Sequence, residues 1–285
     1  MPDRTKDLIP GVFSRHAEAY RDRLATAMDR GEALARTRLV ELLAPGPGER
    51  VLDLGCGPGI LTLPLARAVG PAGLALGVDL AAGMLDLLRA AAPPHVAVAL
   101  MDMEDLGVRD GVFDAVAAGH SLQFCPDLGR ALGEARRVLI PGGRFGATLP
   151  RGGRSSAAWD LLAEVFASRL PDAPEPDDSR ATRQLVGDDD RLVASVRAAG
   201  FIDVALERVD EATSYASPVE LVGRTLSWWV CAWRLEAVSE AARAAVQAET
   251  VEALRDRFGD GPITILGASV VLSGRVPPGR RRPPP

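Results

Sequence analysis

Lysine is almost missing from this chain of 285 residues, in which it occurs only at Lys6. Nearly all of the 33 basic residues are therefore arginine, which we read as a bias of genomic composition. A mechanism through a Schiff base needs a lysine in the core of the protein. Because no lysine follows Lys6, the sequence excludes that chemistry.

Cysteine is also scarce. Cys56, Cys125 and Cys231 lie far apart in the sequence, and no Cys-x-x-Cys pair is present. Isolated cysteines provide neither a disulfide framework nor the ligand spacing of a zinc site. The sequence therefore predicts no structural disulfide and no metal site.

Long apolar runs and an excess of positive charge are missing as well. No apolar stretch reaches about 18 residues, and the N-terminus lacks the pattern of a signal peptide. The formal net charge of -5 provides no basic field to hold a phosphate backbone. We expect a cytoplasmic, soluble monomer or homodimer that acts on a small molecule, without a nucleic acid or membrane partner.

Glycine, by contrast, is concentrated in residues 51–59, which read Val-Leu-Asp-Leu-Gly-Cys-Gly-Pro-Gly. The apolar start is typical of a buried parallel strand, and an apolar helical pattern begins at Ile60. Glycines let the backbone approach a ligand closely, and a helix N-terminus favours a negatively charged group. The segment predicts a ligand-binding loop, with a tight turn that binds nothing as the alternative.

Asp79 closes the next apolar run and narrows the choice of ligand. A carboxylate at the tip of the second strand can accept two hydrogen bonds from a ribose diol. A dinucleotide-binding loop would have its third glycine at position 60, where this chain has Ile60. The pattern therefore favours S-adenosyl-L-methionine (SAM) over NAD.

Apolar periodicity predicts an α/β fold behind this loop. Residues 13–43 have helical spacing and predict two helices ahead of the core. Strands and helices then alternate, which implies a parallel sheet covered on both faces. We expect strands at 50–54, 74–78, 96–101, 112–118 and 144–149, and helices at 59–69, 81–91 and 127–139.

The alternation stops after Pro150. Residues 171–190 are acidic and rich in proline, which is typical of a solvated loop. We expect a helix at 188–199, a strand at 201–209, helical structure at 217–258 and a last, antiparallel strand at 263–272. Residues 276–285 have the composition of a disordered polyproline-like tail.

These residues together resemble the class I SAM-dependent methyltransferases, in particular the branch similar to the enzymes of ubiquinone and menaquinone biosynthesis. Residues 51–59 resemble the first family motif, Asp79 the ribose-binding acid, and residues 101–106 (Met-Asp-Met-Glu-Asp-Leu) the segment after the third strand. Residues 113–116 and 137–145 resemble the fourth strand and the turn into the fifth. The resemblance implies a Rossmann-like sheet of seven mostly parallel strands, with the last strand antiparallel, and helical lids.

The resemblance also implies a division of the chain. Residues 1–45 would form an N-terminal helical lid, and residues 46–210 the SAM-binding core, with an insertion at 151–187. Residues 211–260 would form a helical substrate lid and 261–276 the final core strand, followed by a disordered tail at 277–285. The insertions match no family motif, so the sequence leaves the substrate open.

The cofactor site implied by the resemblance extends from the first strand to the fourth. Asp102 would meet the adenine amino group and Met103 would pack on the ring, although simple core packing also explains a methionine there. The predicted cofactor-binding residues are Tyr20, Asp53, Gly55, Cys56, Gly57, Asp79, Leu80, Asp102, Met103 and Gly119.

His120 follows the fourth strand, where the edge of the sheet would face the transferred methyl group. An imidazole there can take a proton from an acceptor hydroxyl, or it can simply line the pocket. We predict it as the candidate catalytic base. A base is needed only where the acceptor is protonated, because methyl transfer gains most of its rate from positioning.

Aromatic residues predict the acceptor side of the site. Trp228, Trp229 and Trp233 lie close together in a segment with helical spacing. Such a group of tryptophans forms either part of the core or the wall of a binding site. Adjacent tryptophans on a helix point about 100° apart, so one would face the sheet and the other the pocket. Together with His16 on the N-terminal lid, they are the predicted substrate residues.

The sequence predicts a SAM-dependent methyltransferase. The expected acceptor is a small, apolar or polycyclic secondary metabolite or quinone, methylated on oxygen, carbon or nitrogen in that order of preference. Two alternatives remain open. One is a methyltransferase-fold cyclase or other non-methylating enzyme that retains SAM, and the other is a SAM-binding accessory protein.

Overall fold

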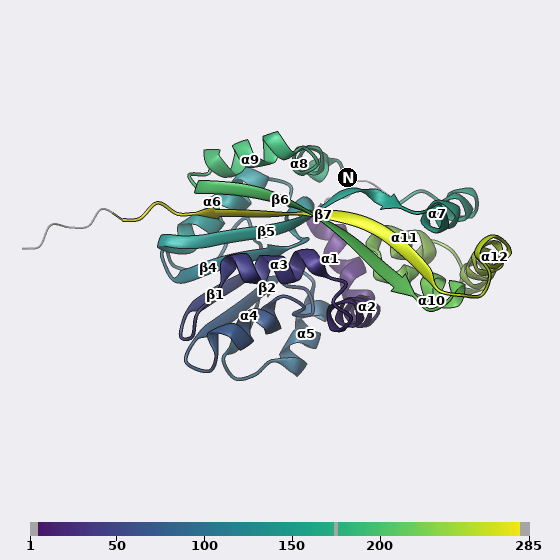
Figure 1. Cartoon of the computed structure of the whole chain (residues 1–285), viewed down its shortest axis with the longest axis horizontal. Helices are drawn as coiled ribbons and strands as arrows, with labels where there is room; N and C mark the ends of the chain where they lie inside the picture. Colours follow the sequence, from purple (N-terminus) through teal and green to yellow (C-terminus); the bar gives the residue numbers. More distant parts are fainter. Residues whose placement is uncertain (1–4, 174–175, 280–285) are drawn as a thin grey trace, which may run out of the picture.

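A computed structural model describes residues 5–173 and 176–279, without the side chains of 152–155. Its centre is a seven-stranded sheet with helices on both faces (Figure 1). The strands are β1 (Arg50–Leu54), β2 (Leu74–Asp79), β3 (Val96–Leu100), β4 (Phe113–Gly119), β5 (Leu139–Ser155), β6 (Ile202–Tyr215) and β7 (Ile263–Arg275). The spatial order β3-β2-β1-β4-β5-β7-β6 agrees with the Rossmann-like sheet that the sequence predicted.

The first five strands are parallel, and β7 is antiparallel to both of its neighbours, β5 and β6. The predicted fold class is therefore confirmed. The turn that the resemblance implied within residues 137–145 lies inside β5 as an irregularity, since the register with β4 shifts between Leu139 and Arg144. Gly142 takes a φ of +81° at this point, which glycine adopts without strain.

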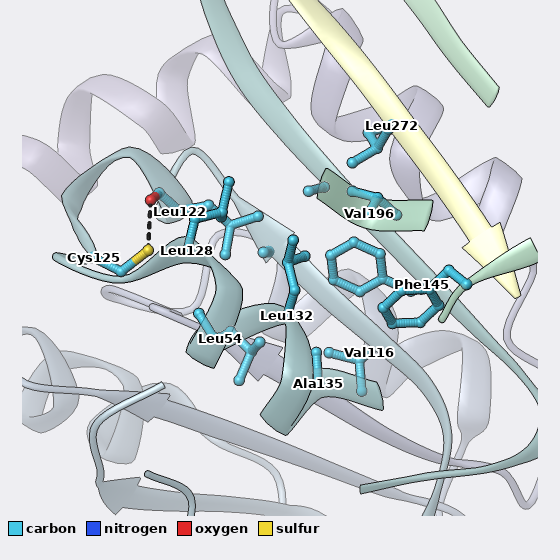
Figure 2. Packing of buried hydrophobic residues seen from close by; sticks show 14 of the residues in the cluster. Leu54, Val116, Leu122, Cys125, Leu128, Leu132, Ala135, Phe145, Val196 and Leu272 are labelled. Atoms are coloured by element: carbon cyan, nitrogen blue, oxygen red, sulfur yellow. Dashed lines mark hydrogen bonds between the residues drawn. The ribbon is translucent and has the colours of Figure 1, made fainter. Parts of the chain in front are cut away.

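Side chains of β1 alternate between the two faces of the sheet. Leu52 and Leu54 join the large core beneath α6 (Leu128–Val138) and α9 (Asp189–Ala198), which Figure 2 shows from close by. Val51 points to the opposite face, beneath α3 (Leu34–Leu43) and α4 (Thr62–Val69). The helix α5 (Ala82–Ala91) covers β2 and β3.

The N-terminal segment forms three helices, and the sequence, which predicted two within residues 13–43, missed the first of them. They are α1 (Thr5–Arg15), α2 (Ala17–Asp29) and α3. Gly31, with a φ of +68°, lies in the turn that separates α2 from α3. The helical pattern from residue 13 onward accounts for α2 and α3 but not for α1, which begins at Thr5.

The last three strands are longer than predicted and extend beyond the edge where the parallel strands end (Figure 1). Their far ends meet a second group of helices: α7 (Ala157–Arg169), α10 (Pro218–Gly223), α11 (Trp229–Glu236) and α12 (Glu240–Phe258). Phe166, Leu221, Leu254 and Ile263 belong to the separate apolar cluster that these elements bury. The chain therefore has two cores joined by one sheet.

The prediction of a loop over residues 171–190, which was based on their acidic composition, is wrong in part. A short 3-10 turn, Asp177–Ser179, is followed by α8 (Arg180–Val186), and α7 occupies most of the insertion before it. The Ser156 side chain caps α7 by accepting a hydrogen bond from the Trp159 amide. The predicted tail lies largely outside the described residues, which end at 279.

No helix in the described ranges is long and apolar enough to cross a membrane.

Leu132 provides a test of the packing of the main core. Its side chain on α6 is fully buried against the sheet (Figure 2). Leu132→Ala should lower the free energy of unfolding by about 2 to 5 kcal/mol, through lost apolar contact and the cavity left behind. Leu100→Ala, at a leucine that is 59% exposed, should cost less than about 0.5 kcal/mol. Urea denaturation measures both, and equal losses would contradict this packing.

Candidate functional site

Three cavities open beside the carboxyl ends of β1, β2 and β4, and Tyr20 lines all of them. Cavity A, of about 100 Å³, contains Gly57, Asp79 and Asp102. Cavity B, of about 520 Å³, lies between the N-terminal helices and the second core. Cavity C, of about 20 Å³, lies beside Asp53 and the glycine loop.

The glycine loop follows β1 and separates cavity A from cavity C. At Gly55 an added Cβ would lie 2.4 Å from the Ser121 Cβ, so only glycine fits against that residue. At Gly57 an added Cβ would meet only the Tyr20 ring, at 3.9 Å, and would project into open space. The backbone at Gly57 therefore has open space beside it, at the wall of cavity A.

Asp79 ends β2 and accepts backbone hydrogen bonds from Gly57 and Ala81, each of 2.8 Å. These bonds fix the carboxylate at the wall of cavity A, and each oxygen keeps a second lone pair for a ligand hydroxyl. Burial raises the pKa of Asp79, although the backbone donors oppose that shift.

Asp53 lies on β1 and is almost completely buried. Its Oδ2 accepts a hydrogen bond of 2.6 Å from the Thr62 hydroxyl, whereas its Oδ1 has no hydrogen-bond partner among the described residues. Burial raises the pKa of Asp53 to about 7; Thr62 and Arg36 act to lower it, and Asp79 acts to raise it. A carboxylate with a free oxygen beside cavity C is suited to a cationic ligand group.

Arg36 on α3 was missed by the sequence reasoning. It is only 8% exposed, it lines cavities B and C, and the described residues provide it with neither a hydrogen bond nor an ion pair. A buried guanidinium is stable only with a partner, which a ligand carboxylate would supply. No signal in the sequence distinguishes Arg36, because arginine is common throughout the chain.

Lys6, the single lysine, is the second residue that the sequence reasoning missed. Its Nζ lies 2.6 Å from Asp102 Oδ2 and 2.7 Å from Glu104 Oε2. Burial lowers the pKa of Lys6, but the two carboxylates outweigh that effect and leave the pKa above its usual value. This ion pair joins α1 to the segment after β3, at the wall of cavity A.

The remaining predicted cofactor residues also lie around the loop. Leu80 and Met103 line cavity A, Cys56 lines cavity C, and Gly119 and Tyr20 line both. The structure thus brings together the residues that the sequence placed in one site.

His120 lies between cavities A and B with a φ of +57°, which is uncommon for a residue other than glycine. Its Nδ1 is 2.8 Å from the Thr148 hydroxyl, and its Nε2 is 3.1 Å from the Ser269 hydroxyl. Ser269 donates its proton to Glu211 Oε2 at 2.7 Å, so Nε2 must donate to Ser269. Nδ1 then accepts from Thr148, and both ring nitrogens have protein partners.

The predicted substrate residues separate into two groups. Trp228 and Trp229 both line cavity B, although Trp228 precedes α11 in an extended conformation, so the helical angle does not relate the two rings. Trp233 lines none of the three cavities. His16 also lies outside them, because its Nε2 is 2.7 Å from Glu236 Oε1 on α11. Two of the four residues therefore line a cavity, and the other two do not.

Comparison with known proteins identifies the family. A model described as a methyltransferase domain matches residues 52–147. Nocamycin O-methyltransferase of Saccharothrix syringae is 33% identical over 94% of this chain and 98% of its own length. The chain is a class I SAM-dependent methyltransferase.

Other relatives share less of this methyltransferase's length. Aklanonic acid methyltransferase DauC of Streptomyces sp. (strain C5) is 38% identical over 59% of this chain and 76% of its own length. The demethylmenaquinone methyltransferase of Symbiobacterium thermophilum is 35% identical over 50% of this chain and 59% of its own.

Solved structures share the fold. A type II methyltransferase from Anaeromyxobacter dehalogenans, 20% identical, superposes with a TM-score of 0.59 over 86% of this chain and 97% of that one. The [4+2]-cyclase SpnF is 22% identical and superposes with a TM-score of 0.53. The superposition covers 87% of this chain and 81% of the cyclase. The fold alone therefore does not select the reaction.

SAM is the cofactor of this methyltransferase. It is a zwitterion at its amino acid end and carries a ribose diol and an adenine. The unpartnered Asp53 oxygen and the unpaired Arg36 guanidinium beside cavity C, together with Asp79 and Asp102 at cavity A, fit these groups.

The raised pKa of Asp53 predicts how stability depends on pH. A group whose pKa is raised on folding stabilises the protein below its unfolded pKa, and this contribution is lost as pH rises through about 7. Without cofactor, the free energy of unfolding of the parent should therefore fall between about pH 5 and pH 8. In the Asp53→Asn variant this fall should be smaller, by on the order of 2 kcal/mol.

Urea denaturation at the two pH values measures this difference. Asp86→Asn is the matched control, because the Asp86 side chain is 72% exposed on α5. Parallel losses in the parent and in Asp53→Asn would show that burial does not disfavour the Asp53 carboxylate.

Proposed function

We propose that this enzyme transfers a methyl group from SAM to a small apolar or polycyclic acceptor, a secondary metabolite or a quinone, with oxygen preferred over carbon and nitrogen. The observation that carries the proposal is the position of cavity B, which shares Phe13, Tyr20, His120 and Phe124 with cavity A. The named substrates of the relatives, nocamycin, aklanonic acid and demethylmenaquinone, support this acceptor class.

The residues around cavities A and C would bind the cofactor in two parts. Asp79 would bind the ribose hydroxyls and Asp102 the adenine amino group, from the wall of cavity A. Arg36 would bind the carboxylate of the amino acid end, and Asp53 would face its ammonium group. When bound, SAM supplies an electrophilic methyl group. The protein's task is then to hold the acceptor in line and to exclude water.

Aromatic side chains form the wall of cavity B on the side of the second core. The Trp229 ring meets Phe124 edge to face at 6.3 Å, and the Trp159 ring meets Trp228 at 5.0 Å. Aromatic faces of this kind suit a flat, apolar acceptor. They support the polycyclic class over a small polar amine.

We also infer that the N-terminal helices and the segment 211–260 act as lids. Arg15 and His16 at the junction of α1 and α2 both bond Glu236 on α11, while Lys6 bonds Asp102 at the cofactor site. These polar contacts close the two segments over the cavities. Side-chain ion pairs of this type open at low cost, as entry of an acceptor requires.

Calorimetric titration tests the cofactor site. Asp79→Ala should weaken SAM binding by about 1 to 3 kcal/mol, through the loss of charge-assisted hydrogen bonds. Arg36→Gln should weaken SAM similarly but leave 5′-methylthioadenosine unchanged, because that nucleoside lacks the amino acid end. The Gly57→Val variant should bind neither SAM nor 5′-methylthioadenosine. The parent should not bind NAD.

Arg38→Gln is the matched control for Arg36, since Arg38 lies two residues away on α3 and bonds Glu41 and Glu207 at the surface. Binding of NAD without SAM would refute the assignment. If Asp79→Ala and Gly57→Val bind like the parent, the loop is structural only. Conversion of SAM to S-adenosylhomocysteine with an acceptor separates methyl transfer from cyclisation.

We propose that His120 positions the acceptor. The sequence predicted it as the catalytic base, and the experiment has to distinguish the two roles. His120→Asn tests this, because asparagine tolerates the positive φ of this position. With an acceptor found by screening, the variant should raise KM and keep kcat within about tenfold, since binding is lost uniformly.

Steady-state kinetics, with SAM affinity measured alongside, decide the role of His120. A fall in kcat of about 10²- to 10⁴-fold at unchanged SAM affinity would instead identify His120 as the general base. Ser269→Ala is the companion variant, because it removes the Nε2 partner and leaves the imidazole in place.

A further inference from the structure

Glu211 on β6 lines cavity B but neither of the cofactor cavities. Its two carboxylate oxygens accept hydrogen bonds from two different elements. Oε1 accepts a bond of 3.1 Å from the Ala35 amide, in the first turn of α3, and Oε2 accepts one of 2.7 Å from the Ser269 hydroxyl on β7. The carboxylate therefore joins the N-terminus of α3 to β7.

Ser269 connects this carboxylate to His120. Ser269 is 2% exposed, and its hydroxyl has a single proton to donate. Because an ionised carboxylate only accepts hydrogen bonds, that proton points to Glu211. The Ser269 oxygen then accepts from His120 Nε2, which lies 3.1 Å away. In this way Glu211 places the proton of the neutral imidazole on Nε2.

The basic nitrogen of the ring faces a residue outside the cavities. Nδ1 of His120 lies 2.8 Å from the Thr148 hydroxyl, and Thr148 is fully buried and lines none of the three cavities. The ring thus lies at the junction of cavities A and B while its lone pair is directed into the protein. A histidine in this form can hold an acceptor in position without taking its proton directly.

The orientation of the ring is fixed from the backbone as well. The His120 amide donates to the Thr148 carbonyl at 3.0 Å, and the His120 carbonyl accepts from Gln123 Nε2 at 2.7 Å. A half-turn of the imidazole would exchange each nitrogen for a carbon and lose the bonds to both hydroxyls. The ring therefore stays in place, and only the position of its proton can change.

We propose that Glu211 is a positioning residue for His120: through Ser269 it selects the Nε2–H tautomer and keeps the basic nitrogen turned to Thr148, away from the acceptor. The meaning of this selection for methyl transfer rests on the proposed function. The selection itself is a property of the folded chain and can be measured without an acceptor.

The Ala35 amide makes the selection testable, because a backbone N–H can only donate. In Glu211→Gln, the side-chain oxygen has to face Ala35, so the side-chain nitrogen faces Ser269 and donates to it. The Ser269 proton is then released to bond His120 Nε2, which requires the ring proton to move to Nδ1. A substitution of nearly the same shape thus reverses the tautomer.

Nitrogen NMR of the full chain, with ¹⁵N in its histidines, measures the tautomer. Histidine occurs only three times in the chain, and His120→Asn assigns the signals of His120. His95 is an internal reference for Nε2–H, since its Nε2 lies 3.0 Å from the Ala66 carbonyl oxygen, which can only accept. At about pH 8.5, where neutral imidazole predominates, His120 of the parent should show the same pattern as His95.

Glu211→Gln should shift the tautomer ratio of His120 toward Nδ1–H by about tenfold or more, because the opposite tautomer leaves a hydrogen bond unmade. The other two histidines should not change. Glu207→Gln is the matched control, since Glu207 is an exposed carboxylate on the same strand that bonds Arg38. This control removes the same charge and should leave the ratio as in the parent.

Ser269→Ala is the second variant, and it removes the link between Glu211 and the ring. The ratio should again move toward Nδ1–H, because Nε2–H has lost its acceptor while Thr148 can still accept. In the Ser269→Ala background, Glu211→Gln should cause no further change. A further shift in that background would show that Glu211 does not act through Ser269 and would overturn the proposal.

The proposal is also overturned if the parent has the ring proton of His120 on Nδ1, or if a folded Glu211→Gln variant keeps the parental ratio. Should that variant not fold, an unchanged ratio in Ser269→Ala overturns it. A titration of the parent with S-adenosylhomocysteine tests the methyltransferase function separately. Failure of the cofactor product to bind would refute that function, whereas the tautomer spectra decide the role of Glu211.

Discussion

The pairing of β7 with β5 on one side and β6 on the other is the interaction on which the site depends. It continues past the edge where the parallel strands end, to Ser155 on β5 and to Tyr215 on β6. The same strands thus belong to the core under α6 and to the core of α7, α10 and α12. Because β7 pairs along both cores, despite a register shift between Arg151 and Ser155 of β5, its residues form a wall of cavity B.

The functional residues differ in how the fold supports them. Asp79 is fixed by backbone donors and is half-buried, whereas Asp53 is bonded by the Thr62 hydroxyl and is buried, and both carboxylates keep lone pairs for a ligand. Arg36 is buried, and the part of the chain that the structure describes gives it neither a hydrogen bond nor an ion pair. Burying such groups costs free energy that a ligand of opposite charge offsets on binding. The site is therefore built for a zwitterionic cofactor.

The cofactor half of the site could be predicted because its information is local. A strand, a glycine turn and a helix are adjacent in sequence, and the parallel order places Asp79 beside the loop. The acceptor half could not be predicted in the same way. Arg23, Glu211 and Trp159 come from separate elements, and no periodicity records that they meet.

The sequence by itself determined the parallel sheet, the glycine loop and the identity of the cofactor, since each follows from residues close in the chain. Only the tertiary structure decided the bonds of the His120 ring, the lone guanidinium of Arg36 and the ion pair of His16 with Glu236. The bonds of His120 to Ser269 and of His16 to Glu236 join residues more than a hundred positions apart, and the burial of Arg36 is not revealed by composition. The side chain alone fixes what a residue can do, and the packing around it decides which of those roles remains.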